Sequence, residues 1–131
     1  MAAQLIPAAF FLLATMFSPH AAAADQGADS AACFGNAVGD ANVAACGRLI
    51  DARNLRGAEL VRAHLQRAIF LSRRGDDYER VIADADRILE IEPQNVDALV
   101  LRGASLQRRG QSKRAQDDIA GAVRLGPSSV L

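Results

Sequence analysis

The fold is decided by two matching stretches of sequence, LSRRG at residues 71–75 and LQRRG at residues 106–110. They lie 35 residues apart, and two prolines further along the chain, Pro93 and Pro127, lie 34 residues apart. An extra acidic residue in Gly75-Asp76-Asp77-Tyr78 accounts for the difference of one residue. A period of this length is typical of stacked pairs of helices.

Each period predicts two helices, because apolar and small residues recur in it at helical spacing. Gly75 and Gly110 are expected to end the first helices in a left-handed conformation. Pro93 and Pro127 are expected to end the second ones. The residues that define the four helices are Leu65, Ala68, Ile69 and Ser72; Tyr78, Val81, Ile82, Ala85, Ile88 and Leu89; Leu99, Gly103 and Leu106; and Ala115, Ile119, Ala122 and Val123.

Residues 61–127 resemble two consecutive tetratricopeptide repeats. The second repeat matches the family motif at Gly103, Leu106, Gly110, Ala115, Ala122 and Pro127, and the first is a looser match through Ala68, Val81 and Ile88. The resemblance implies an all-α fold, a short right-handed α-solenoid of antiparallel helix pairs. The repeats would occupy residues 61–94 and 96–129, within a domain of residues 57–131.

Residues 25–56 are expected to form an N-terminal cap. Val43, Cys46, Leu49 and Ile50 lie on one face of a predicted lone helix that resembles half of a further repeat. The two cysteines, Cys33 and Cys46, predict a disulfide that ties an N-terminal loop onto this helix. A redox-active pair is the alternative, but the close C-x-x-C spacing that lowers a thiol pKa is missing.

Residues 1–24 read as a secretory signal peptide. The apolar run from Leu5 to Phe17 is shorter than the roughly 20 residues that a membrane helix needs, and small residues at Ala22 and Ala24 suit cleavage after Ala24. An uncleaved anchor is the alternative. The expected location is the bacterial periplasm or the exterior, without membrane attachment after cleavage.

Charge is balanced overall, with 15 basic and 15 acidic residues, but it is banded along the chain. Residues 48–75 carry seven arginines and two acids, and residues 76–95 carry seven acids and two arginines. Complementary neighbouring helices would explain the bands. The alternative is a basic strip that binds an acidic partner, formed by Arg73, Arg74, Arg108 and Arg109.

The family resemblance also implies that the first helices of the pairs line a concave groove for a peptide. The predicted groove residues are Arg62, Leu65, Ile69, Arg73, Val100, Ala104, Gln107 and Arg108. An apolar floor edged by arginines suits a hydrophobic or amphipathic segment that carries some acid. At the other end, no polar helix follows Pro127, so Ile119, Val123 and Leu125 are expected to be partly exposed.

Catalytic and metal-binding patterns are weak. His64 is the single histidine beyond the predicted signal, and Asp84 and Asp86 diverge by about 200° around a helix. We therefore expect no metal, no cofactor and no nucleic-acid partner. The sequence predicts a non-enzymatic adaptor or scaffold that binds an unidentified protein or peptide. One alternative is an assembly subunit or homodimer joined through the C-terminal helix, and another is a small hydrolase-type enzyme using Asp84 or His64.

Overall fold

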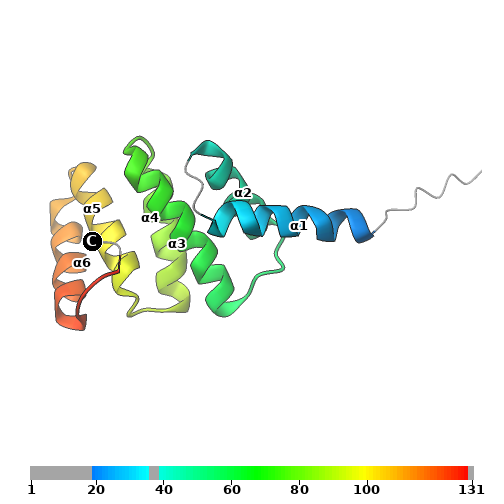
Figure 1. Ribbon diagram of the computed structural model, residues 1–131. Helices are drawn as coiled ribbons and strands as arrows, with labels where there is room; N and C mark the ends of the chain where they lie inside the picture. Colours follow the sequence, from blue (N-terminus) through cyan, green and yellow to red (C-terminus); the bar gives the residue numbers. More distant parts are fainter. Residues whose placement is uncertain (1–18, 36–38, 130–131) are drawn as a thin grey trace, which may run out of the picture.

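The protein is all-helical in the part of the chain that the computed structural model describes, residues 19–35 and 39–129. Figure 1 shows the helices side by side in chain order, with the N-terminal end of α1 extending away from the others. The described residues form six helices: α1 (Pro19–Phe34), α2 (Asp40–Asp51), α3 (Gly57–Arg74), α4 (Tyr78–Ile91), α5 (Val96–Arg108) and α6 (Ser112–Leu125).

Packing follows the order of the chain. Every helix contacts the next one, and the odd-numbered helices α1, α3 and α5 also contact one another in turn. The largest apolar cluster runs from α1 to α5, from the cysteine pair through Leu71 and Val81 to Leu101. A smaller cluster of Ile82, Leu106 and Ala115 joins α4, α5 and α6. The core is therefore a continuous strip along the row of helices.

The predicted helix ends are confirmed. Gly75 follows α3 with a φ of 72°, and Gly110 follows α5 with a φ of 76°, a left-handed conformation that glycine adopts without steric cost. Helix α4 ends at Ile91, two residues before Pro93. Asn95 caps α5 through its side-chain oxygen, which accepts a hydrogen bond from the backbone N–H of Ala98.

Close helix approach explains the small residues of the second period. Gly103 is buried, and a Cβ atom added there would lie 3.0 Å from Cδ1 of Ile119 and 3.3 Å from the carbonyl oxygen of Ala115. Ala115 and Ala122 on α6 are buried as well. These residues let α5 and α6 approach more closely than larger side chains would allow.

The disulfide is present, but its setting corrects the sequence-based expectation. Cys33 and Cys46 are joined by an S–S bond of 2.02 Å and are both fully buried. Cys33 lies on α1, which packs against α2 and α3, so the bond joins two helices instead of tying a loop to a lone helix. Alanine-rich sequence, with good intrinsic helix propensity, extends this helix although it carries few large apolar residues.

The predicted signal peptide falls mostly outside the described residues, because only residues 19–24 of it belong to α1. No helix within residues 19–35 and 39–129 has the length and apolar character needed to span a bilayer.

Candidate functional site

The predicted groove residues on α3 lie on a face that α1 shares. The guanidinium carbon of Arg62 sits 4.1 Å from the ring centroid of Phe34 on α1, at cation–π distance. Leu65 and Ile69 are partly buried and pack against the apolar cluster that contains the disulfide. Much of the apolar surface predicted for a groove floor is therefore used within the fold.

The predicted groove residues on α5 lie beside the α6 end of the molecule. Val100 borders a cavity of about 170 Å³ together with Ile119 and Val123. Gln107 borders another cavity, of about 420 Å³, which Ile119 also lines. Ala104 is exposed. These residues thus adjoin the apolar C-terminal end of the row.

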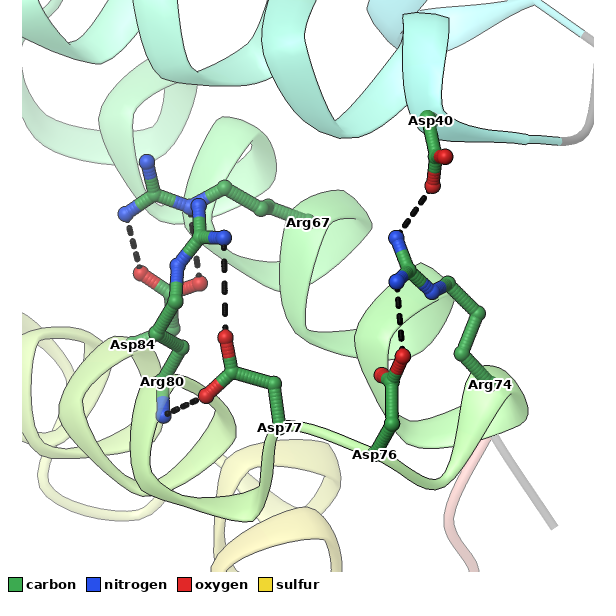
Figure 2. A network of polar contacts seen from close by, with 7 residues as sticks. All are labelled: Asp40, Arg67, Arg74, Asp76, Asp77, Arg80 and Asp84. Atoms are coloured by element: carbon green, nitrogen blue, oxygen red, sulfur yellow. Dashed lines mark hydrogen bonds and ion pairs between the residues drawn. The ribbon is translucent and has the colours of Figure 1, made fainter.

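The predicted basic strip is divided by ion pairs. Arg109 pairs with Glu79. Arg74 bridges Asp40 on α2 and Asp76, as Figure 2 shows. Arg73 and Arg108 are exposed and have no ion pair within the described part of the chain. Among the described residues, Arg73 and Arg108 are therefore the two arginines of the strip without an acidic partner, and they lie 35 residues apart, on α3 and α5.

The C-terminal end of the row exposes apolar side chains, as predicted. The exposed fractions are 38% for Ile119, 75% for Val123 and 43% for Leu125. The residues 34 positions earlier, Ala85, Leu89 and Ile91 on α4, belong to a cluster that includes Val61 and Leu65 of α3 and Ala98 of α5. In the preceding period α4 is therefore packed between two helices, whereas α6 contacts α5 alone among the described helices.

A buried polar group lies between α3 and α4, where apolar contacts dominate. Asp84 is 2% exposed and accepts a two-pronged contact from Arg67: Nε to Oδ2 at 2.9 Å and Nη2 to Oδ1 at 2.6 Å (Figure 2). Nδ1 of His64 lies 2.8 Å from Oδ1 of the same carboxylate. His64 is only 6% exposed, so its contact with Asp84 lies inside the protein.

The same arginine–aspartate pair recurs one period later, between α5 and α6. Arg102 contacts Asp118 through Nε to Oδ2 at 2.8 Å and through Nη2 to Oδ1 at 2.7 Å. Its third nitrogen, Nη1, contacts Asp86 of α4 at 2.7 Å. Neither arginine stands out in the sequence, where Asp84 and Asp86 are considered only as candidate metal-binding or enzymatic residues. The signal that could have found the two pairs is their spacing, 35 residues between the arginines Arg67 and Arg102 and 34 between the paired aspartates.

The environment of Asp84 favours its ionised form. Burial by itself raises the pKa of Asp84, but the hydrogen bonds from His64 and Arg67, with the charge of Arg67, outweigh it and leave the pKa below 3.8. An ionised carboxylate only accepts hydrogen bonds, so Nδ1 of His64 carries a proton. Asp86 turns to Arg102 instead, which agrees with the predicted divergence of the two aspartates.

Few other side chains near His64 could take part in acid–base or metal chemistry. The cavity beside His64 is lined by three arginines and three aliphatic residues, with no hydroxyl, thiol or carboxylate among them. Within the described ranges no cluster of three or more His, Cys, Asp or Glu side chains is arranged to hold a metal ion. Searches against protein families, curated proteins and solved structures give no match for this chain.

Proposed function

We propose that this chain is an exported, non-enzymatic helical-repeat scaffold that binds a partner protein. The proposal includes a short right-handed solenoid of antiparallel helix pairs related to tetratricopeptide repeats. Three observations support this arrangement: the 34- to 35-residue period, the successive contacts of odd-numbered helices, and the recurring arginine–aspartate pair. Helix α1 then pairs with α2 as a complete first pair instead of half a repeat. The buried disulfide suits an oxidising, exported location.

The observation that carries the binding function is the exposed end formed by Ile119, Val123 and Leu125. The periodicity indicates what this surface accepts. In the preceding period the equivalent residues of α4 share an apolar cluster with Val61 and Leu65 of α3 and with the small residue Ala98 of α5. The expected occupant is therefore an amphipathic helix of a partner protein, docked on α6 as α5 docks on α4.

The relief of this surface fits a helix. The cavities of about 420 Å³ and about 170 Å³ share Ile119 as a lining residue. Side chains at helical spacing on a partner would enter these two depressions beside Ile119. Gln107 and Val100 then contribute from α5, so two residues of the predicted groove belong to this binding surface.

A photo-crosslinking amino acid placed at Val123 tests the proposal in cells that export the protein. We expect one predominant partner, identified by mass spectrometry, whose crosslinked peptide is an amphipathic helix. The matched control places the same amino acid at Asp117, an exposed position on the same helix that pairs with Lys113. Equal adducts at the two positions would contradict a specific surface, and an adduct with a second copy would favour the homodimer.

The affinity of α6 variants for the purified partner then distinguishes the role of the apolar surface from that of the rest of the helix. Val123→Glu should weaken binding by about tenfold or more, because it places a charge in a desolvated apolar contact. Lys113→Glu, which changes charge at the far end of α6, should leave the affinity within a factor of two or three. Unchanged binding by Val123→Glu would remove this surface from consideration.

A second binding mode is favoured by the two unpaired arginines, Arg73 and Arg108. Both are exposed, and they sit on α3 and α5, which contact each other. A groove that uses them predicts that Arg73→Glu with Arg108→Glu abolishes binding of an acidic partner and that salt weakens wild-type binding. Binding at the α6 end predicts that the double reversal has little effect, so the two modes give opposite results.

A further inference from the structure

A separate cavity of about 300 Å³ lies where α2, the loop after it, α3 and α4 meet. Its charged lining consists of Arg53, Arg56 and Arg87, and His64 forms part of its wall. Its apolar lining consists of Ile50, Leu55 and Leu60. The scaffold function proposed above uses none of these residues.

The three arginines differ in the contacts that their guanidinium groups already make. Arg87 pairs with Glu90 on its own helix. Arg56 turns back to the loop, where Nη1 donates to the carbonyl oxygen of Leu55 at 2.8 Å and also to that of Arg53. Arg53 itself has no ion pair or side-chain hydrogen bond among the described residues. One guanidinium, that of Arg53, is therefore fully available to a ligand.

His64 supplies a second, independent indication. Its Nδ1 is used by Asp84, and its Nε2 has no hydrogen-bond partner in the described part of the chain. Every fully buried side-chain nitrogen or oxygen there has a partner, so Nε2 of His64 is accessible from outside, and His64 forms part of the cavity lining. A side chain that is only 6% exposed thus keeps one ring nitrogen open to a ligand.

Arg53 lines this cavity from a backbone conformation that is unfavourable for arginine. Arg53 is the one non-glycine residue with a positive φ, 55°, among the residues described. Arginine is rare in this conformation, which asparagine or glycine adopts more readily. Arg56 fastens the same loop through the two carbonyl contacts, so the guanidinium of Arg53 is presented by an ordered turn.

We propose that this cavity binds an organic monocarboxylate with a short apolar tail. The free guanidinium of Arg53 can pair with a single negative charge, and its fork of N–H donors matches the two oxygens of a carboxylate. The aliphatic residues receive the tail, and the volume lies at the small end of ligand-binding pockets. The carboxylate could be carried by a free small molecule or by the C-terminal residue of a peptide, since both present the same chemistry.

Titration of the protein with octanoate, followed by ¹⁵N NMR of the His64 ring, tests the proposal. We expect saturable movement of the His64 ring signals, and no movement with octanamide, which has the same tail without the charge. A short peptide ending in a free leucine carboxylate, compared with its C-terminal amide, distinguishes the two sources. Stronger binding of the acid peptide than of octanoate assigns a peptide terminus, and the reverse order assigns a free carboxylate.

Two matched variants connect the binding to Arg53. Arg53→Asn keeps a residue type that tolerates the positive φ and should weaken octanoate binding by about tenfold or more, the loss expected for one charged hydrogen bond. Arg124→Asn removes an exposed arginine of α6 and should leave binding unchanged. The proposal is overturned if octanoate moves no signal, if octanamide acts equally, if Arg53→Asn binds as the wild type does, or if inorganic phosphate binds more tightly than octanoate.

Discussion

Substitution of Asp84 by asparagine should destabilise the protein more than the same substitution at the equivalent Asp118. Both carboxylates receive two nitrogens from an arginine of the preceding helix, so the two sites make a matched pair. They differ in their surroundings. The side chain of Asp84 is 2% exposed and that of Asp118 is 9% exposed, and Asp84 also holds His64.

The expected magnitudes follow from what each arginine keeps. Removing one partner of a buried ion pair costs about 3–5 kcal/mol, because the other charge stays buried without compensation. Asp84→Asn leaves Arg67, whose side chain is 16% exposed, without its carboxylate, so we expect a loss of about 3 kcal/mol. Asp118→Asn leaves Arg102 with Asp86, at 2.7 Å, and with a side chain that is 22% exposed, so we expect about 1–1.5 kcal/mol.

Urea denaturation followed by far-UV circular dichroism at pH 7, with the disulfide intact, measures both losses. A pH series adds a check on the cause. The pKa of Asp84 lies below its ordinary value of 3.8, so its ionised form stabilises the fold above about pH 4. That contribution is lost as the pH falls through the lowered pKa. The difference between wild type and Asp84→Asn should therefore shrink in this acidic range.

Either of two results would refute the reasoning. If Asp118→Asn costs as much as Asp84→Asn or more, the second carboxylate on Arg102 does not compensate as the geometry requires. If the cost of Asp84→Asn is the same at pH 2.5 as at pH 7, the ionised carboxylate is not what stabilises the helix pair.

The other predictions concern single features of the fold and are measured by the same urea titration. Replacing both Cys33 and Cys46 by alanine should cost about 3 kcal/mol, because the unfolded chain gains the freedom of a loop with 13 residues of separation. An unchanged free energy of unfolding would mean that packing alone holds α1 against α2. Gly103→Val should cost about 2 kcal/mol, because its Cβ would meet Ile119 at 3.0 Å; a stabilised variant would show that α6 shifts freely. Asn95→Ala should cost about 1 kcal/mol by removing a helix cap, and a neutral result would show that water replaces it.

The periodic part of the fold is predictable because its determinants are local. Helical spacing places Ala68, Ile88 and Leu106 inside, and the structure buries all three. Gly75 and Pro93 mark chain reversals that backbone sterics impose whatever the neighbours are. The exposure of apolar residues on α6 follows from the same pattern, because among the described helices only α5 packs against α6.

Two features escape such reasoning because they depend on partners far apart in sequence. Helix α1 has few large apolar residues, and what fixes it is the contact of Cys33 with Cys46 together with packing on α3. Buried charges follow the same rule. An aspartate such as Asp84 is usually solvated, and only the approach of a second helix with an arginine in register makes burial favourable. The cavity beside Arg53 is harder still to predict, since its lining comes from three helices and a loop.

The balanced net charge conceals how the arginines are divided between folding and recognition. Arg67 and Arg102 are held by aspartates between helices, and Arg74 and Arg109 by acids at the surface. Arg67 and Arg74 pair with acids of the acidic band of residues 76–95, and Arg102 and Arg109 also reach acids of that band, Asp86 and Glu79.

The arginines without an acidic partner are informative, because the fold does not depend on an ion pair from them. Arg53 lies at the loop before α3, and Arg73 and Arg108 lie on the face shared by α3 and α5. Replacing any of these three should change stability by less than about 0.5 kcal/mol. Loss of binding without loss of stability would then separate recognition from folding in a chain where other arginines, such as Arg67 and Arg102, pair with acids between the helices.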